Sequence, residues 1–318
     1  MGTWLAIGAS ISPAIAVEPG LPSKTSVVAA TLRAIGAKHP DAELRNPDFL
    51  AIKLLGPAER AIVEDFPTDA LDLDFDAAVQ RLSAPDRGSV TTMNLRTKHI
   101  DKALDDALGD RVRQVIILGA GLDSRGYRFR ERSRGVRFLE VDYGPTQEYK
   151  KQRVKDLFGK LPSEVRYVPM DFTKDDLLSQ LRTGGYSEKE RSFFIWEGVS
   201  MYLPEAAVRQ TLRFVREHAA PNSTLVFDYA TASDPNVNNP GSRFARMGEP
   251  WIFGFPGVSA EHLLRQERLS IVSDHTYPDL IEQYGLRRQP KSGSSFPVIT
   301  GDQKTRRICI ARVDDGPR

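Results

Sequence analysis

Apolar residues recur at helical spacing through the first third of the chain. The stretch 23–39 is predicted to be a helix with Ser23 as its N-cap, because a serine hydroxyl can accept a hydrogen bond from a free amide of the first turn. The stretch 91–109 is predicted to be a longer amphipathic helix that ends at Gly109. Between these two stretches, three prolines divide the pattern into short helical pieces that end near residue 82.

After residue 110 the pattern changes to short apolar runs that alternate with helical stretches. Five of these runs are predicted to be strands: 114–119, 135–142, 164–171, 191–198 and 223–230. Two later runs, 268–274 and 306–313, are expected to form a final pair at one edge, for which an antiparallel arrangement stays open. Alternation of this kind is typical of a sheet with helices on both faces. The sequence therefore predicts an α/β fold with a Rossmann-like, mostly parallel sheet of about seven strands.

We expect a single domain that follows a separate N-terminal arm. Residues 1–22 are mildly apolar, but no basic residue precedes the apolar part and Pro13 interrupts it, so a flexible or docking arm is expected rather than a signal peptide or a membrane span. The stretch 231–257 is rich in Asn, Pro, Gly and aromatic residues and follows no period, which is typical of a cap. The expected parts of the domain are a helical cap over 23–110, a ligand-binding core over 111–230, a lid or insertion over 231–267 and C-terminal strands over 268–318.

The charges of the chain are nearly balanced. Its 318 residues include 44 basic and 42 acidic ones, and a formal net charge of +2 argues against nucleic acid or an anionic membrane as a partner. The stretch 125–137 carries six arginines, and we expect it to be a solvated surface. Cys309 is the single cysteine and is expected in the core. The five histidines show no metal-ligand spacing, so no metal site is expected.

Polar residues follow four of the predicted strands at the point where each strand ends. The first strand leads into the glycine-rich turn 119–123, and acids follow the next three strands at Asp142, Asp171 and Glu197. Ligands of open parallel sheets bind outside the carboxyl ends of the strands, so a ligand site is predicted at this edge. Taken singly, an acid at a strand end is also a common helix N-cap, and that interpretation stays open for Asp142 and Asp171.

A nicotinamide dinucleotide is one candidate ligand. Its fingerprint needs three glycines and an acid about 20 residues further on. Gly119 and Gly121 supply the first two glycines and Asp142 lies at the expected distance, but Ser124 replaces the third glycine. A carboxylate at Asp123 would also repel the pyrophosphate. An NAD(P)-dependent oxidoreductase is therefore kept as the alternative function.

S-adenosylmethionine is the second candidate, and it needs no third glycine because it carries no phosphate. The Asp142 carboxylate has two acceptor oxygens, which suit the two ribose hydroxyls. Asp171 can accept from the adenine amino group while the Phe172 amide donates to the ring. The ligand ammonium fits the Gly119 carbonyl or the Glu197 carboxylate.

Two further sets of side chains have open interpretations. Arg96 lies on the helix before the first strand and could form a forked hydrogen bond with the ligand carboxylate. It could instead pair with Asp101 or another acid on its own helix. Trp251, Phe253 and Phe255 are either core residues or residues of a lid that faces the substrate.

Four segments carry a resemblance to a known family: "VIILGAGLDSRGYRF", "FLEVD", "PMDF" and "IWEGVSMYLPEAAV". Over about residues 23–230 the chain resembles the leucine carboxyl methyltransferase family, and it looks most similar to the bacterial branch of S-adenosylmethionine-dependent O-methyltransferases. That branch includes carboxyl and hydroxyl methyltransferases of natural-product pathways. The resemblance implies a class I methyltransferase sheet and an enzyme that uses this cofactor. We expect a cytoplasmic enzyme, since the cofactor is made in the cytoplasm. The segments before residue 20 and over 231–257 are not part of the family pattern.

The resemblance also implies roles for individual residues. Arg96 would bind the methionine carboxylate, Asp142 would hold the ribose, and Glu197 would close the pocket. Lys24 lies where the first helix of the family offers a lysine to the carboxylate of the ligand or the substrate. The full predicted cofactor set is Lys24, Arg96, Gly119, Gly121, Asp123, Asp142, Tyr143, Asp171, Phe172 and Glu197.

Methyl transfer from a sulfonium is an in-line displacement, so most of the catalysis is positioning of the acceptor, about 3 Å from the methyl carbon. A carboxylate acceptor needs no base, and Lys24 or Tyr202 would suffice as its anchor. An alcohol or phenol would need a base, and His262 in the predicted lid is the candidate. We expect a carboxylate or an acidic phenol of a small molecule or peptide. A non-catalytic cofactor-binding regulator is the alternative from another class, and a homodimer is compatible with either.

Overall fold

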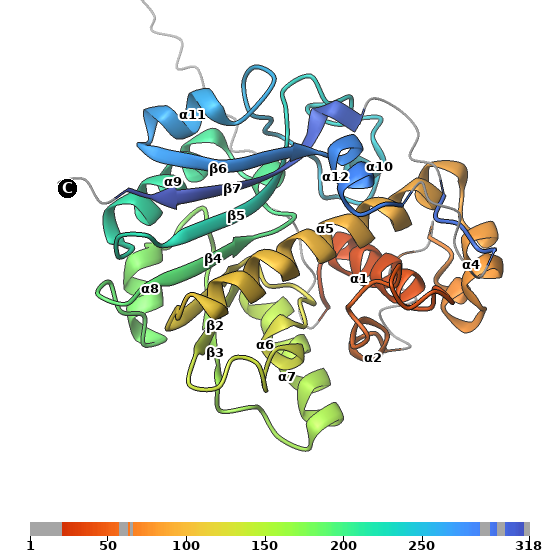
Figure 1. Cartoon of the computed structure of the whole chain (residues 1–318), viewed down its shortest axis with the longest axis horizontal. Coiled ribbons are helices and arrows are strands. Elements are labelled where there is room, and N and C mark those ends of the chain that lie inside the picture. The colour runs from red at the N-terminus through yellow and green to blue at the C-terminus, as the bar shows by residue number, and fades with distance from the viewer. Residues whose placement is uncertain (1–20, 57–62, 64–65, 287–292, 298–302, 315–318) are drawn as a thin grey trace, which may run out of the picture.

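Figure 1 shows a computed structural model of the protein, which describes residues 21–56, 63, 66–286, 293–297 and 303–314. Its seven-stranded sheet has the order β3-β2-β1-β4-β5-β7-β6. The strands are β1 (Gln114–Leu118), β2 (Arg137–Asp142), β3 (Val165–Pro169), β4 (Ser192–Trp196), β5 (Thr224–Ala230), β6 (Leu269–Thr276) and β7 (Arg306–Val313). Strands β1 to β5 pair in parallel, and β7 is antiparallel to both β5 and β6. This confirms the predicted α/β class and the antiparallel pair at one edge.

Helices precede the sheet and connect its strands. The α-helices are α1 (Lys24–Gly36), α2 (Ala51–Leu54), α4 (Phe75–Arg81), α5 (Ala84–Gly109), α6 (Arg125–Arg128), α7 (Gly144–Phe158), α8 (Leu177–Thr183), α9 (Glu205–His218), α10 (Arg243–Arg246), α11 (Glu261–Gln266) and α12 (Tyr277–Gln283). The short 3-10 helices are η1 (Thr68–Asp72), η2 (Ser200–Tyr202) and η3 (Gln303–Thr305). Helix α5 begins earlier than predicted, with Pro85 in its first turn. The backbone amides of a first turn have no partner within the helix, so the missing N–H of a proline costs nothing there.

The two faces of the sheet are covered by different helices. Along β1, Val115 and Ile117 pack on the face that carries α5 and α12, whereas Ile116 and Leu118 pack on the face that carries α8, α9 and α11. Successive side chains of a strand point to opposite faces, so an unbroken apolar run identifies a strand that is buried on both sides. Cys309 on β7 is fully buried in this core, as predicted.

The N-terminal helices form a cap beside the sheet. In Figure 1, α1, α2 and α4, in red and orange, gather around one end of the long helix α5. Helix α1 packs against α5. The Ser23 hydroxyl accepts a hydrogen bond from the amide of Ser26, which confirms the predicted N-cap of α1.

The segment 231–257, here called the insertion, leaves the end of β5 and returns to it. Thr231 pairs with Phe255, and Val237 pairs with Trp251. Phe253 and Phe255 belong to the core on the α9 face of the sheet. Trp251 instead packs in a small cluster at the end of β5. The insertion is therefore anchored to the sheet at its two ends.

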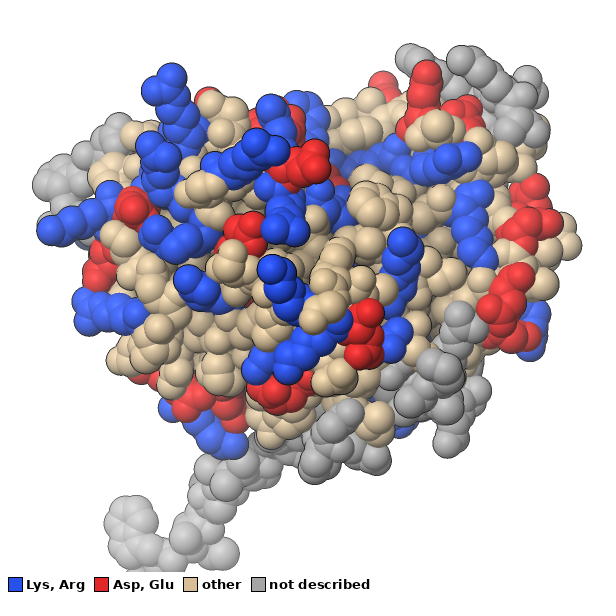
Figure 2. Space-filling model, turned by 90° about the horizontal axis from the view of Figure 1, so that it is seen from below, with Lys and Arg blue, Asp and Glu red and all other residues tan. Residues whose placement is uncertain are grey.

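The exposed surface mixes both signs of charge. Figure 2 shows Lys and Arg side chains interspersed with Asp and Glu on one face of the molecule. The expectation that 125–137 is a solvated surface is wrong for Arg125 and Arg128, whose side chains are 3% and 5% exposed. Both arginines are buried against α5, where they share the carboxylate of Asp101.

The predicted arm over 1–22 lies outside the described residues, except for residues 21 and 22. Across the ranges that the structure describes, no helix combines the length and the apolar character needed to cross a membrane.

Candidate active site

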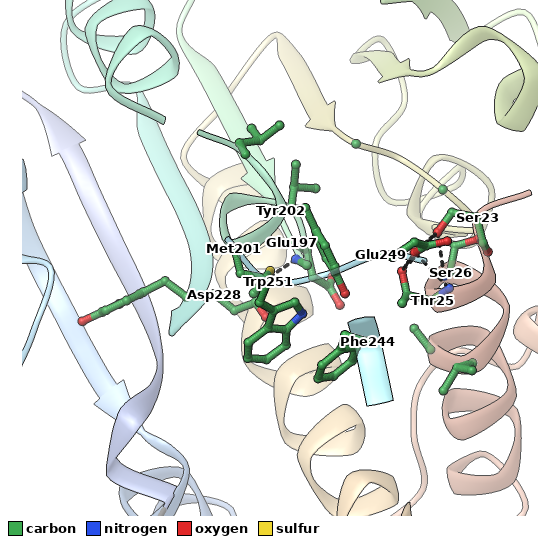
Figure 3. A pocket seen from close by; sticks show the side chains of 18 of the residues that line it. Ser23, Thr25, Ser26, Glu197, Met201, Tyr202, Asp228, Phe244, Glu249 and Trp251 are labelled. Atoms are coloured by element: carbon green, nitrogen blue, oxygen red, sulfur yellow. Dashed lines mark hydrogen bonds between the residues drawn. The ribbon is translucent and has the colours of Figure 1, made fainter. Parts of the chain in front are cut away.

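A cavity of about 890 Å³ opens at the carboxyl ends of the parallel strands. Cavities of roughly 300–1,000 Å³ are typical of small-molecule sites, so this volume can hold a cofactor together with an acceptor. Figure 3 shows part of its wall, to which α1, η2 and the insertion contribute side chains. The predicted residues that line the cavity are Arg96, Gly119, Gly121, Asp123, Asp142, Tyr143, Asp171, Phe172, Glu197 and Tyr202.

The glycine-rich turn after β1 forms the floor of the cavity and requires glycine at two positions. Gly119 has φ = +72°, and an added Cβ would lie 2.3 Å from Cγ2 of Val199. Gly121 has φ = +43°. Its amide donates a hydrogen bond of 2.5 Å to Oδ2 of Asp142, whose Oδ1 accepts from the Tyr143 amide at 2.7 Å. Asp142 thus holds the turn in place at the cavity wall.

The surroundings of Asp142 shift the pKa of its carboxyl toward neutral pH. Burial raises the pKa of the Asp142 carboxyl to about 6, although the hydrogen bonds from the Tyr143 and Gly121 amides favour the ionised form. Helix α7 starts after Tyr143, and no side chain caps its N-terminus. The N-cap interpretation is therefore wrong for Asp142.

Asp171 has a different role in the local structure. Its Oδ1 accepts hydrogen bonds from the amide and the hydroxyl of Thr173, at 2.9 Å and 2.6 Å, and its Oδ2 pairs with Lys174 at 2.8 Å. These contacts fix the turn after β3. Asp176 is the N-cap of α8, so the helix-capping interpretation is wrong for Asp171, which also lines the cavity. Phe172 lies next to it on the same wall.

Arg96 lies between two buried carboxylates. Its Nε donates to Oε1 of Glu197 at 2.7 Å, and its Nη1 donates to Oδ2 of Asp228 at 2.8 Å. Its Nη2 faces Gly198, where an added Cβ would lie 3.7 Å away. Burial raises the pKa of Asp228 even though Arg96 lies against it. Asp228, at the end of β5, is a cavity residue that the sequence analysis did not identify.

Glu197 joins Arg96 to a second buried arginine. Nη1 of Arg125 contacts Oε2 of Glu197 at 2.7 Å and also pairs with Asp123, while its Nε contacts Asp101 at 2.7 Å. Burial alone would raise the pKa of Glu197, but the guanidinium groups of Arg125 and Arg96 outweigh it and hold that pKa well below its ordinary value. Glu197 therefore stays ionised.

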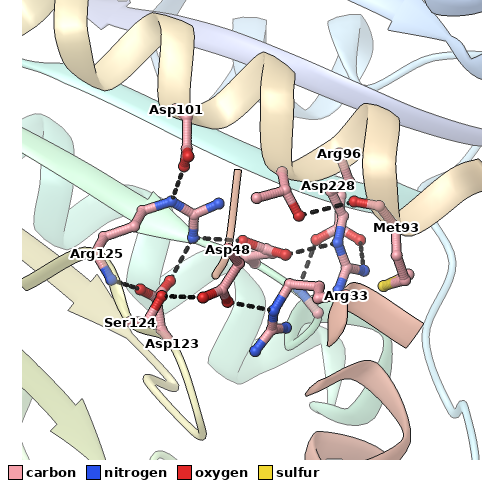
Figure 4. Close-up of polar contacts among 12 residues, drawn as sticks. Arg33, Asp48, Met93, Arg96, Asp101, Asp123, Ser124, Arg125 and Asp228 are labelled. Atoms are coloured by element: carbon pink, nitrogen blue, oxygen red, sulfur yellow. Dashed lines mark hydrogen bonds and ion pairs between the residues drawn. The ribbon is translucent and has the colours of Figure 1, made fainter. Parts of the chain in front are cut away.

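The same network ties the N-terminal helices to the turn after β1 (Figure 4). Oδ2 of Asp48 accepts from Nε of Arg33 at 2.8 Å, and its Oδ1 accepts from the hydroxyl of Ser124 at 2.5 Å. Nη2 of Arg33 donates to the carbonyl of Leu122 at 2.9 Å. Helix α1 and the segment that carries Asp48 are thus fixed to the turn after β1 by hydrogen bonds.

The charges around the cavity do not balance. Among the described lining residues, five are basic and seven are acidic, which leaves a formal charge of −2. The basic residues are Arg33, Arg96, Lys174, Arg243 and Arg306, and the acidic ones are Asp123, Asp142, Asp171, Glu197, Asp228, Asp234 and Glu249. The cavity is negative although the whole chain carries +2, so it favours a cationic ligand over an anionic one.

The wall formed by η2 and the insertion is aromatic. The rings of Phe244 and Trp251 stack with centroids 4.4 Å apart, and Tyr202 meets Trp251 edge-on at 6.3 Å. Burial, helped by the nearby carboxylate of Glu249, raises the pKa of Tyr202 to about 12. Its hydroxyl therefore stays protonated and can donate a hydrogen bond into the cavity (Figure 3).

Two predicted residues lie elsewhere. His262 is exposed on α11, where its ring shares a hydrogen bond with Gln266, and it is not among the described residues that line the cavity. The His262 prediction is wrong because its place in the predicted lid over 231–267 does not determine which way the side chain faces. Lys24 also has an exposed side chain outside the lining set, and only its backbone amide faces inward, toward Glu249 at 2.7 Å.

Known proteins resemble this chain over most of its length. The Bacillus subtilis protein "Putative S-adenosyl-L-methionine-dependent methyltransferase YktD" is 28% identical over 293 residues, which cover 87% of this chain and 95% of that protein. A relative from Mycolicibacterium gilvum with the same description, apart from the name YktD, is 30% identical and covers 71% of each chain.

Two solved structures share the fold. A DUF574 family protein from Streptomyces avermitilis has a TM-score of 0.57 at 14% identity, covering 92% of this chain and 98% of its own. A protein from Thermobifida fusca has a TM-score of 0.51 at 15% identity, covering 93% and 96%. The sequence model "Leucine carboxyl methyltransferase" matches residues 26–216. The resemblance found in the sequence is thereby confirmed, and with it the methyltransferase class: the chain belongs to the leucine carboxyl methyltransferase family.

Proposed function

We propose that the protein is an S-adenosylmethionine-dependent O-methyltransferase that acts on a carboxylate or an acidic hydroxyl of a small molecule or peptide. One observation carries the proposal: acids from the ends of neighbouring strands, Asp142, Asp171 and Glu197, line a single cavity above a glycine-rich turn. Membership of a methyltransferase family and the descriptions of the relatives support the same cofactor.

The lining of the cavity suits this cofactor chemically. Asp142 uses one lone pair of each oxygen for a backbone amide, so each oxygen keeps a lone pair for a ribose hydroxyl. Asp171 and the Phe172 amide would hold the adenine, and Arg96 would hold the methionine carboxylate. The net charge of −2 around the cavity complements a ligand with a sulfonium and an ammonium group.

The same lining disfavours a dinucleotide. A pyrophosphate needs the N-terminus of a helix directly after the glycine turn. Here α6 has only four residues, and Asp123 lies at its start. The excess of acidic side chains would also repel the two phosphates.

The cofactor supplies, when bound, a methyl group activated by a sulfonium. The protein supplies position: the cavity holds the acceptor in line and excludes water. The Tyr202 hydroxyl, kept protonated by its raised pKa, would donate to the acceptor oxygen. Lys24 has no part in this scheme, because its side chain faces away from the cavity.

The acceptor class follows from the absence of a ready base. No histidine is found among the described residues that line the cavity. The carboxylate of Glu249 already accepts four hydrogen bonds, three at Oε2 and one at Oε1, so taking up a proton would weaken its contact with α1. An acceptor that is ionised in solution needs no base, and this favours a carboxylate or an acidic phenol over an alcohol.

The experiment uses cofactor with a labelled methyl group and a panel of carboxylic acids, phenols and alcohols. We expect label in an organic product, and we expect alkali to release it as methanol if the acceptor is a carboxylate, because esters hydrolyse and ethers do not. Transfer only to alcohols would contradict the acceptor class. Binding of NAD but not of S-adenosylhomocysteine would contradict the proposal as a whole.

A further inference from the structure

The two ends of the insertion are held by backbone pairing. The amides of Ile252 and Phe253 donate to the carbonyl of Met201, and the amide of Phe255 donates to the carbonyl of Ala230. Gly254 lies so close to the start of the insertion that an added Cβ would be 2.7 Å from the backbone of Ala232. The contact with Ala230 joins this end of the insertion to β5 and the contacts with Met201 join it to η2, so residues 252–255 are fixed by backbone hydrogen bonds.

The part between these ends, residues 238–250, is here called the flap. Its contacts with the N-terminal helices are made by side chains. Arg243 pairs with Asp86 at the start of α5. Glu249 reaches the amino end of α1 and is 5% exposed. The flap also lines the cavity through Arg243, Phe244 and Glu249, so moving it would open the cavity wall.

Four hydrogen bonds hold the Glu249 carboxylate against the start of α1. Its carboxylate accepts from the Ser23 hydroxyl at 2.8 Å, the Lys24 amide at 2.7 Å, the Thr25 amide at 3.2 Å and the Thr25 hydroxyl. A carboxylate at a helix N-terminus also interacts favourably with the helix dipole. These partners lie about 225 residues away in sequence, so the contact fastens two distant parts of the chain across the cavity.

We propose that the flap is a gate over the cavity and that the Glu249 carboxylate is the latch that holds it closed against α1. Cofactor and acceptor exchange when the latch opens, so Glu249 sets the rates of entry and release through its contact with α1. Glu249 is therefore a positioning residue. This inference rests on the proposed function for the identity of the ligand, but the latch itself can be measured without any ligand.

The first test is hydrogen exchange of the ligand-free protein, comparing wild type with Glu249→Gln. A glutamine amide nitrogen cannot accept, so one donor loses its partner if the nitrogen replaces Oε1, and three do if it replaces Oε2. We expect exchange at the amides of residues 24–26 and 238–250 to rise by about tenfold or more, since hydrogen bonds to charged groups are strong. Thr25→Val, which removes one donor and keeps the shape, should raise exchange less and at the same amides. Glu261→Gln is the control, because Glu261 is an exposed residue that pairs with Arg265 on α11.

The second test is stopped-flow binding of S-adenosylhomocysteine. A gate predicts that Glu249→Gln raises both the association and the dissociation rate by about tenfold, with a much smaller change in Kd. A merely structural role predicts weaker binding with no gain in the association rate, and that result would overturn the proposal. Unchanged exchange at 24–26 and 238–250 in a folded variant would do the same. If exchange rises but wild type does not bind the ligand, the latch stands and the proposed cofactor is wrong.

Discussion

The guanidinium of Arg96 lies 2.8 Å from Oδ2 of Asp228, on the side opposite its contact with Glu197. Asp228 also accepts a hydrogen bond of 2.5 Å from the Gly198 amide. It therefore fixes the residue that we expect to bind the cofactor carboxylate and the loop that follows β4. If either Arg96 or Asp228 is replaced, the other remains as a buried charge without this partner.

Asp228→Ala should lower the free energy of unfolding by about 3–5 kcal/mol, because removing one partner of a buried ion pair leaves the other uncompensated. Asp228→Asn should cost less, since its amide oxygen can still accept from Arg96. Urea unfolding measures both. Asp105→Ala is the control, because Asp105 forms an exposed pair with Arg132 and should cost about 1 kcal/mol or less. If Asp228→Ala lowered the free energy of unfolding by less than about 1 kcal/mol, the pair with Arg96 would contribute nothing to stability.

Cofactor affinity should fall at acid pH because of Asp142. The pKa of its carboxyl is raised to about 6, and the protonated form has lost an acceptor for the ribose hydroxyls. We expect Kd for S-adenosylhomocysteine, measured by calorimetry, to be constant above pH 7 and to rise roughly tenfold per unit below about pH 6. Asp142→Asn should weaken binding at pH 7.5 by about 1–3 kcal/mol and remove the pH dependence. A wild-type Kd that does not change between pH 7.5 and 5 would refute this role.

Gly119→Ala should destabilise the protein. The residue adopts φ = +72°, and a Cβ would overlap Cγ2 of Val199. Left-handed backbone alone costs about 1–2 kcal/mol for an alanine, and the overlap adds to it. Val199→Ala in the same chain should recover part of the loss in a double-mutant cycle. Gly109→Ala is the matched control, because an added Cβ there meets no atom within 4 Å and alanine favours a helix.

The protein should lose stability in mild acid because of His99. Burial, with a smaller contribution from His275, lowers the pKa of His99 to about 4. Between pH 6.5 and 4 the unfolded chain therefore takes up a proton that the folded chain does not, so the free energy of unfolding falls as the pH falls. The difference reaches about 3 kcal/mol at pH 4. Unfolding curves of wild type and His99→Gln should diverge over this range, whereas the exposed His262→Gln should follow wild type.

Much of the fold and half of the site could be predicted because both depend on local patterns. Apolar runs that alternate with amphipathic helices imply a parallel sheet, and the acids after the runs then meet at one edge. That reasoning placed Asp142, Asp171 and Glu197 around one cavity, as the structure does. It did not find Asp228, because an acid inside the apolar run 223–230 looks like an interruption of a strand.

The remaining residues depend on contacts between distant segments. Glu249 lies in an insertion whose apolar residues follow no regular spacing, and only the packing of that insertion against α1 reveals its partners. Arg125 belongs to an arginine-rich run that looks solvated, yet it is buried against Asp101 on α5 and Glu197 directly after β4. His262 was chosen for its chemistry and its place in the predicted lid, but its side chain on α11 is exposed to solvent.

The account depends on the nucleoside of the cofactor lying across the carboxyl ends of β1 to β4. The most direct test is a crystal structure of the protein with S-adenosylhomocysteine. We predict both ribose hydroxyls within hydrogen-bond distance of the Asp142 carboxylate, the adenine beside Asp171 and Phe172, and the sulfur facing Tyr202 and the aromatic wall. A ligand bound elsewhere, or a ribose turned away from Asp142, would contradict it.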